Sequence, residues 1–194
     1  MKSDGEGLAS KLNRLRLTPA GTYEKQIAEI LRALGIEDRF RKRQPVPEAT
    51  ELVSVGRDIY GREQKLAPDA AAAWIKMKQA AEADGKFLLL VSAFRSVAYQ
   101  RQIVERKLAA GQAMEQILQV SAAPGFSQHH SGGVIDVTAQ NGQPLTEEFE
   151  RTAEFLWLRR HDIGNTECPM YTCARLIPVP QCPEMLNEPL RLLS

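Results

Sequence analysis

Apolar residues recur at helical spacing in five segments of the chain. This periodicity predicts helices over residues 23–34, 69–84, 98–110, 114–120 and 147–160. Gly35, Gly85 and Gly111 each follow one of these segments directly, at the position where glycine commonly ends a helix. Ser96 and Thr146 precede two others and are predicted to cap them, because a hydroxyl there accepts a hydrogen bond from a backbone N–H.

Three shorter segments have the pattern of strands. Residues 51–62 contain alternating apolar positions before a Tyr-Gly turn, and residues 87–91 form a continuous apolar run that suits a buried strand. In residues 134–138 the side chains alternate between two faces, with Asp136 on the face opposite to Ile135. Together with the helices, these strands predict an α+β fold, in which a small, mainly antiparallel sheet is flanked by helices on one side.

The chain divides into three predicted regions. Residues 1–48 hold the first helix and a basic arm, residues 49–164 form the core, and residues 165–194 form a C-terminal segment. Five of the eleven prolines and all three cysteines lie beyond Gly164, so the composition changes abruptly there. An altered reading frame or a replaced C-terminus would produce such a change, and a comparison of the three coding frames would test this hypothesis.

Composition and charge exclude several classes of function. The chain has 194 residues, 43% of them hydrophobic, and a formal net charge of +1, so it has material for a core but no general basic field. Binding to nucleic acid or to a membrane surface is therefore not favoured. No stretch is long and apolar enough to predict a membrane span, and the charged first 16 residues are not a signal peptide. The sequence as given indicates a cytoplasmic protein, export by another route, or an incomplete or mature start, and it does not choose between these three. It carries no signal for an oligomeric state.

Two further features have structural rather than chemical interpretations. The three cysteines, Cys168, Cys173 and Cys182, are odd in number and follow no export signal, which argues against a disulfide framework. They contain no Cys-x-x-Cys pair, so a cysteine-based zinc cluster is not favoured either. The basic run at residues 39–43 is typical of a solvated helix end, although it could also contact phosphate.

The stretch Pro124–Val137 carries the candidate chemistry. It contains His129 and, seven residues later, Asp136, a carboxylate within an apolar strand pattern. Such a carboxylate is costly to bury unless it is paired or bound to a metal. Gly132 and Gly133 allow the tight turn that would bring the imidazole back beside the carboxylate. An imidazole and a carboxylate in contact supply two of the three protein ligands of a catalytic zinc site; the alternative is a solvated Gly/Ser-rich turn.

Two motifs, one within Pro124–Val137 and one upstream of it, resemble those of a known family. The run from Ser127 to Asp136 is similar to the S-x-H-x-x-G-x-x-x-D signature of the VanY-like zinc D-alanyl-D-alanine carboxypeptidases, peptidase family M15. Upstream, Ser92-Ala93-Phe94-Arg95-Ser96 followed by Gln100 is similar to the family's S-x-Y-R-S-x-x-x-Q. Two motifs in this order are more specific than either alone. The resemblance covers residues 66–158 and implies a zinc D,D-peptidase-like α+β fold.

The resemblance implies roles for five of these residues. His129 and Asp136 would ligate zinc, and Arg95 would hold the C-terminal carboxylate of the substrate. Ser127 and Gln100 would also contribute to substrate binding. The Arg95 guanidinium suits the binding of a terminal carboxylate because its planar group can donate two parallel hydrogen bonds to the two carboxylate oxygens.

The resemblance fails near the C-terminus. There the family has Glu-Pro-Trp-His, in which the glutamate is the general base and the histidine is the third zinc ligand. This chain has Glu188 and Pro189, but Arg191 stands at the ligand position and cannot be deprotonated to bind zinc. Glu188 is therefore the predicted general base, with Glu167 and Glu184 as weaker candidates.

Several residues could replace the missing ligand. His161 follows a predicted helix and is the first candidate, while His130 is the second and adjoins His129. Cys168 and Cys173 are further candidates, and the position could also be empty or filled by water.

Three functions follow from these observations. The first is zinc-dependent D-alanyl-D-alanine carboxypeptidase activity on peptidoglycan stem peptides ending in D-alanine, impaired by the lost third ligand. The second is a non-catalytic module that binds the same peptides through Arg95. The third is a protein that binds a partner or phosphate through residues 39–43. The family implies a location in the cell envelope, which conflicts with the lack of a signal peptide in the first 16 residues.

Overall fold

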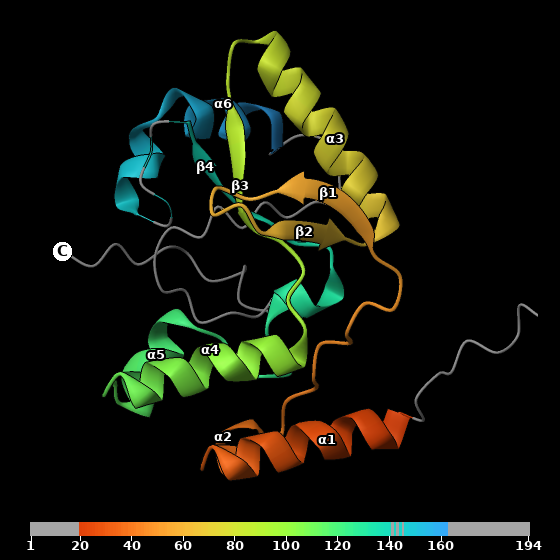
Figure 1. Cartoon of the computed structure of the whole chain (residues 1–194), viewed down its shortest axis with the longest axis vertical. Coiled ribbons are helices and arrows are strands. Elements are labelled where there is room, and N and C mark those ends of the chain that lie inside the picture. The colour runs from red at the N-terminus through yellow and green to blue at the C-terminus, as the bar shows by residue number, and fades with distance from the viewer. Residues whose placement is uncertain (1–19, 141, 143, 145, 163–194) are drawn as a thin grey trace, which may run out of the picture. The chain divides into compact units, whose positions relative to one another are not determined.

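The computed structural model describes residues 20–162, apart from residues 141, 143 and 145. Figure 1 shows its elements along the chain. They are α1 (Ala20–Ala33), α2 (Glu37–Phe40), β1 (Val53–Arg57), β2 (Glu63–Leu66), α3 (Pro68–Ala83), β3 (Leu88–Ser92), α4 (Val97–Ala109), α5 (Met114–Val120), the 3-10 helix η2 (Gln128–Ser131), β4 (Asp136–Ala139), the 3-10 helix η3 (Glu147–Arg151) and α6 (Ala153–Asp162). The chain forms two compact units, residues 1–45 and residues 46–194. The predicted boundary after residue 48 stays a prediction, and the one after residue 164 lies outside the described residues.

The first unit contains the predicted amphipathic helix. Helix α1 begins three residues earlier than the periodicity predicts, and its stripe of Ile27, Ile30 and Leu31 is buried. Gly35 follows it with φ +70°, a left-handed conformation that ends helices and that glycine adopts without strain. Ile36, in the turn that follows, is also buried, and its N–H donates to Leu31 O at 3.0 Å.

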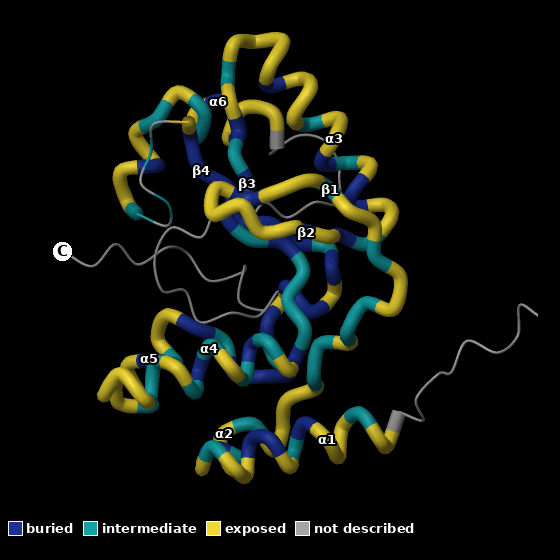
Figure 2. Tube along the Cα trace, in the orientation of Figure 1, coloured by how far each residue is buried: buried dark blue, intermediate teal, exposed yellow. Residues whose placement is uncertain are grey.

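The core of the second unit is built on the antiparallel pair of β3 and β4. The predicted motif strand and the predicted apolar strand are therefore hydrogen-bonded neighbours, with Leu90 opposite Val137 and Ser92 opposite Asp136. Ile135 and Val137 belong to the hydrophobic core, as the alternation predicts. Figure 2 shows the buried positions concentrated on these strands and on the inner faces of the helices around them. Helices α3 and α6 contribute further core residues, among them Ala70, Ala71, Trp74, Trp157 and Leu158.

Strands β1 and β2 form a second antiparallel pair rather than extending the first sheet. The α+β class is confirmed, but the single small sheet expected from the sequence is, within the described residues, two separate two-stranded pairs. An irregularity between Ser54 and Arg57 interrupts the β1–β2 register, and bulges of this kind increase strand twist. The β1–β2 pair and the β3–β4 pair are joined by isolated backbone hydrogen bonds, from Ile59 N to Leu90 O at 2.9 Å and from Phe94 N to Lys65 O at 3.0 Å.

The predicted helix over residues 147–160 is interrupted. Residues 147–151 form the 3-10 helix η3, and α6 starts at Ala153. Thr152 lies between them with extended backbone angles, and its hydroxyl accepts a hydrogen bond from Phe155 N at 3.1 Å. Thr152 therefore caps α6. Thr146 stands at the N-cap position predicted for it, but the element that it precedes is η3, and its side chain makes no capping hydrogen bond there.

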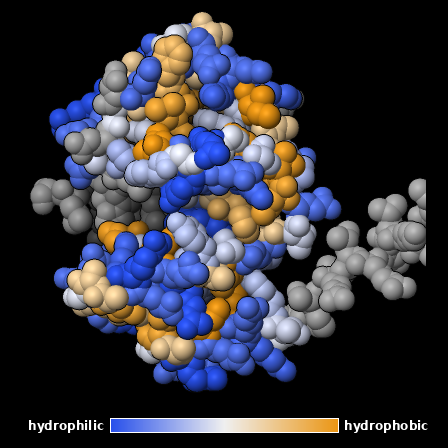
Figure 3. All heavy atoms as spheres, viewed as in Figure 1, coloured by the Kyte–Doolittle hydropathy of each residue, from blue (hydrophilic) through white to orange (hydrophobic). Residues whose placement is uncertain are grey.

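The remaining helices agree closely with the sequence. Ser96 caps α4, because its hydroxyl accepts a hydrogen bond from Tyr99 N at 3.0 Å. Within residues 20–162 no helix combines the length and the apolar composition of a membrane crossing. On the face shown in Figure 3, hydrophobic residues lie in small groups among hydrophilic ones.

Candidate functional site

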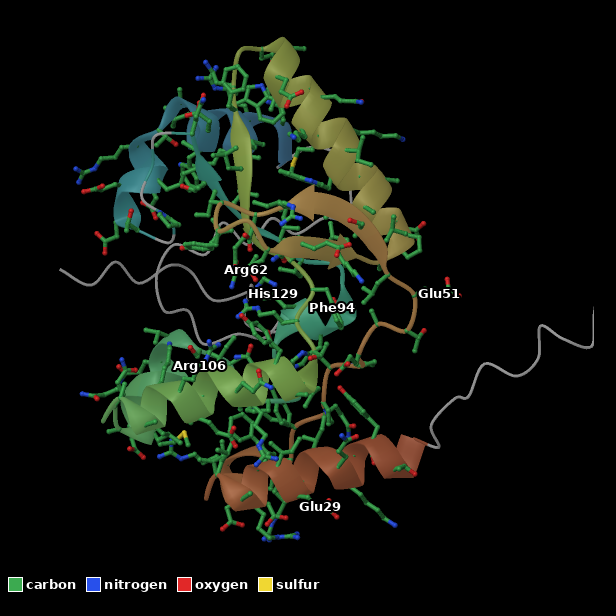
Figure 4. The ribbon with its side chains drawn as sticks, viewed as in Figure 1. Glu29, Glu51, Arg62, Phe94, Arg106 and His129 are labelled. Atoms are coloured by element: carbon green, nitrogen blue, oxygen red, sulfur yellow. The ribbon has the colours of Figure 1, made fainter. Side chains whose placement is uncertain are left out.

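The motif residues His129 and Asp136 meet at one end of the β3–β4 pair. His129 lies on η2, and Asp136 is the first residue of β4. Both are buried, with 5% and 4% of their surface exposed. The distance from His129 Nε2 to Asp136 Oδ2 is 3.3 Å. Figure 4 shows His129 near Phe94, where the chain leaves β3.

The His129 ring is oriented by a backbone carbonyl. Its Nδ1 lies 2.6 Å from Ala93 O. A carbonyl oxygen can only accept a hydrogen bond, so Nδ1 carries a proton, and in the neutral form of the ring the lone pair is on Nε2. Nε2 faces the carboxylate of Asp136.

Gly132 makes the turn between the two residues. Its φ of +68° lies in the left-handed region, and its N–H donates to His129 O at 3.3 Å. A Cβ atom at this position would come within 3.0 Å of Ala67 N and 3.1 Å of Ala49 Cβ. Conformation and space both require glycine here. Gly133 has no positive φ, so one glycine rather than two makes the turn.

Arg95 joins the same cluster from the loop after β3. One guanidinium nitrogen lies 3.4 Å from Asp136 Oδ2 and the other 3.4 Å from Gln100 Oε1. Its backbone N–H donates to His129 O at 3.2 Å. The side chain is mostly buried, with 16% of its surface exposed. The structure thus places a cation next to the imidazole–carboxylate pair.

Gln100 lies behind Arg95. It is fully buried on α4, and its Nε2 donates to Ala122 O at 2.7 Å while its Oε1 accepts from Arg95. In this geometry the amide orients the guanidinium. Direct contact between Gln100 and a substrate stays a prediction, as does the role of Ser127, which is buried directly before η2.

His130 has a different task from its neighbour. It is fully buried, its Nδ1 donates to Arg95 O at 2.6 Å, and its Nε2 accepts from Gly125 N at 3.1 Å. Burial lowers the pKa of His130 below its ordinary value, with a smaller opposing contribution from the bond to Arg95 O. Both ring nitrogens are engaged, so the sequence-based alternative of His130 as a metal ligand does not fit the structure.

His161 is not brought to this cluster. It lies on α6, stacked on Trp157 with 4.1 Å between ring centroids, and its Nδ1 donates to Trp157 O at 2.9 Å. Its Nε2 lies 4.0 Å from Asp84 Oδ2. Asp84 lies before the first residue of β3, whereas Ala93 and Arg95, which contact His129, lie after its last residue, so the two histidines are at opposite ends of this strand.

The other predicted site residues lie outside the described part of the chain. Glu188, Glu167 and Glu184, the candidate bases, are among them, as are Cys168 and Cys173. Their roles stay predictions. Within residues 20–162, no group of three His, Cys, Asp or Glu side chains is placed to hold a metal ion.

Sequence reasoning missed the side chains that support the site from a distance. Glu48 Oε2 accepts from Val97 N at 2.8 Å, at the start of α4. Gln64 Oε1 accepts from Ala93 N at 2.9 Å. These partners are 49 and 29 residues apart, and no local pattern marks such a pair.

Comparisons with known proteins agree with the motifs. The family model described as VanY, D-alanyl-D-alanine carboxypeptidase, matches residues 63–164, just over half of the chain. No curated protein matches the sequence.

Three solved structures are similar to parts of this chain. The LdcB LD-carboxypeptidase has a TM-score of 0.51 and 28% identity, over 58% of this chain and 55% of that one. A mutant of the vancomycin resistance D,D-pentapeptidase VanY in complex with Zn(II) has a TM-score of 0.45 and 22% identity, over 61% and 67%. VanYB in complex with D-alanine-D-alanine has a TM-score of 0.45 and 20% identity, over 61% and 66%. The chain thus spans about half the length of the LdcB chain that it matches.

Proposed function

Because the chain belongs to the VanY family of D-alanyl-D-alanine carboxypeptidases, we propose that it is a zinc-dependent carboxypeptidase acting on peptidoglycan stem peptides that end in D-alanine. The observation that carries this proposal is the arrangement of His129, Asp136 and Arg95. A histidine nitrogen faces a carboxylate oxygen at 3.3 Å, and a guanidinium adjoins them.

The donor atoms of this pair fit a zinc ion. A lone-pair nitrogen and a carboxylate oxygen repel each other unless a proton or a cation lies between them. Zinc accepts both atom types, and the backbone carbonyl on the far side of the His129 ring is a usual outer partner of a zinc-ligating histidine. His129 and Asp136 would hold the metal. When bound, zinc would act as a Lewis acid that polarises a peptide carbonyl and activates water.

The other side chains orient the substrate. Arg95 is proposed to hold the terminal carboxylate of the peptide, with Gln100 keeping its guanidinium in place. A binding site for a free C-terminal carboxylate would restrict hydrolysis to the last peptide bond. Ser127 is proposed to hydrogen-bond the peptide and Glu188 to act as general base, both on the resemblance to the family alone. Arg191 at the family's ligand position predicts weak zinc retention and reduced turnover.

Metal analysis and peptide hydrolysis test the proposal. Purified protein is expected to bind zinc and to release D-alanine from a peptide ending in D-alanyl-D-alanine, and His129→Ala is expected to abolish both. A second peptide, in which the terminal D-alanine follows an L-residue, is tested in parallel. The comparison shows whether the protein cleaves a D,D-linkage, an L,D-linkage or both. His161→Ala is the matched control, because the structure places His161 away from the pair and predicts unchanged zinc binding. Release of D-alanine at the wild-type rate by His129→Ala would contradict the proposal.

A non-catalytic peptide-binding module is the second candidate. It is favoured by the way Arg95 is held, since Gln100 and Asp136 position the guanidinium through protein contacts alone. This function predicts that the peptide binds without turnover, equally well with and without a chelator. Arg95→Ala would then lose binding, whereas His129→Ala would keep it.

A further inference from the structure

The carbonyl that orients His129 is itself held on both sides by β2. Ala93 O, which accepts from His129 Nδ1, belongs to the peptide group between residues 93 and 94. The N–H of that same peptide group, Phe94 N, donates to Lys65 O at 3.0 Å. The preceding amide, Ala93 N, donates to the side chain of Gln64 at 2.9 Å. Two consecutive peptide groups at the site are thus fixed by neighbouring residues of β2.

The orientation of the Gln64 amide follows from its second partner. Gln64 is 8% exposed, and its Nε2 donates to Asp58 Oδ2 at 2.7 Å. An ionised carboxylate can only accept hydrogen bonds, so the NH₂ group faces Asp58 and the amide oxygen faces Ala93 N. Asp58 therefore determines which end of the Gln64 side chain reaches the site.

Asp58 is held firmly enough to serve this purpose. Its side chain is fully buried, and it accepts from Tyr60 N at 2.9 Å, from Arg62 N at 2.9 Å and from Arg62 Nε at 2.7 Å. Burial by itself raises the pKa of Asp58, but the hydrogen bonds from Arg62 and Tyr60 outweigh it and hold the pKa below its ordinary value. The carboxylate is thus charged and fixed at neutral pH.

We propose that Gln64, oriented by Asp58, is a positioning residue for His129. The path runs from Asp58 to the Gln64 amide, from there to the backbone at Ala93, and from Ala93 O to His129 Nδ1. It keeps a proton on Nδ1 and directs Nε2 towards Asp136. The inference rests on the proposed function in so far as His129 is a zinc ligand.

A purely structural role for Gln64 makes a different prediction. The β1–β2 pair is also joined to β3 through Ile59 N and Leu90 O at 2.9 Å and through Arg62 and Val91 O at 3.1 Å. These bonds remain when Gln64 is replaced, so a merely structural role predicts a loss of stability without a change at His129. A positioning role predicts a change in the tautomer and the metal affinity of His129 in protein that stays folded.

The test uses the full chain with Gln64→Met, which has a similar volume but no hydrogen-bonding end. Zinc affinity is measured by competition with a chromophoric chelator, and the ¹⁵N resonances of the His129 ring are measured in zinc-free protein. Zinc binding is expected to weaken by up to about 10-fold, the low end of the effect of removing an outer partner of a metal ligand, because Ala93 O itself remains. The two ring resonances are expected to move towards each other as the tautomers mix. Trp157→Phe, which loses the Trp157 Nε1–Asp84 bond at the other end of β3, controls for destabilisation.

Two further variants keep the proposal testable if Gln64→Met does not fold. Asp58→Asn leaves the Gln64 amide present but free to turn, and is expected to shift both measurements in the same direction. In the double variant Asp58→Asn/Gln64→Glu, the new carboxylate at position 64 can accept from Ala93 N, and the new amide at position 58 can donate to that carboxylate. Part of the lost zinc affinity is therefore expected to be recovered.

The outcomes separate this inference from the proposed function. Wild-type zinc affinity and unchanged ring resonances in folded Gln64→Met overturn the positioning role. If wild-type protein binds no zinc, the proposed function fails, and the ring resonances of zinc-free protein alone decide the inference. Mixed tautomers in the variant then support the positioning role, and unchanged resonances overturn it.

Discussion

At the scale of single residues, the site depends on how adjacent side chains divide their tasks. His129 uses one ring nitrogen to bond the backbone and directs the other at Asp136. His130 uses both nitrogens to join the loops that contain Arg95 and Gly125. The two residues are neighbours of the same type, yet only the first keeps a nitrogen for chemistry. The sequence cannot distinguish them, because the difference lies in partners 5 and 35 residues away.

Gly132→Ala is the first prediction at this scale. We expect it to lower the free energy of unfolding by about 1–2 kcal/mol for the left-handed backbone and by about 1–3 kcal/mol more for the close approach to Ala67 and Ala49. Denaturant unfolding measures the loss. The matched control is Gly85→Ala, because Gly85 has a similar φ of +66° with open space around its Cβ position. Equal losses in the two variants would show that the contacts around Gly132 contribute nothing.

At the scale of elements, short connections rather than long strands align the site. Residues 46–49 run beside the motif loop, with Val46 N donating to Gly125 O and Ala49 N donating to His130 O, both at 2.8 Å. Between these two bonds, Glu48 reaches the first N–H of α4. This segment precedes the family match at residue 63, and it links the loop of His130 to the helix that follows Arg95.

Glu48→Ala tests this connection. The Glu48 carboxylate satisfies a backbone N–H at a helix start and interacts favourably with the helix dipole. Its loss is expected to reduce the free energy of unfolding by about 0.5–2 kcal/mol, the range for removal of a helix cap. Glu48→Gln keeps an acceptor and should lose less. Glu51→Ala, at an exposed position of the same approach to β1, is the control, and a loss in Glu48→Ala no greater than that of Glu51→Ala would contradict the prediction.

At the scale of the whole molecule, stability in acid should depend on Asp58. Its pKa is lower in the folded chain than its ordinary value of 3.8, so the unfolded chain binds more protons in the pH range between the two values. The stabilisation is therefore fully present above pH 3.8 and is lost as the pH falls through the folded pKa.

A comparison of wild type with Asp58→Asn isolates this contribution. At neutral pH the variant is expected to unfold about 1–3 kcal/mol more easily, because buried donors lose a charged acceptor. The difference is expected to shrink as the pH falls below 3.8, when Asp58 itself becomes protonated. Chemical unfolding at a series of pH values measures it. A difference that stays constant across the series would show that the charge of Asp58 is unimportant.

Much of the fold could be predicted because the signals are local. The elements from α3 to α5 lie within one residue of their predicted positions, since apolar spacing, Ser96 and the stop glycines act over a single turn. The break at Thr152 was missed because helical periodicity continues across it. The β1–β2 hairpin was predicted only in part: residues 51–62 indicated a strand and a turn, but β2 contains a single apolar residue, Leu66, and so has little strand pattern of its own.

The candidate site was also predicted only in part. The turn glycines led to the expectation that His129 and Asp136 meet, and the resemblance to the family implied that Arg95 lies at the same site; the structure places the three together. It does not bring His161 to them, because Trp157 and Asp84 hold that ring elsewhere. The proposed support through Gln64 depends on two hydrogen bonds that span different parts of the chain.

The sequence alone determined which chemical groups are present and where the chain turns, because the spacing of side chains and the conformational range of a glycine are properties of neighbouring residues. The tertiary structure decided which nitrogen of which histidine remains available to a ligand. That choice depends on carbonyl and amide partners from distant segments, and only the folded chain brings these groups within hydrogen-bonding distance.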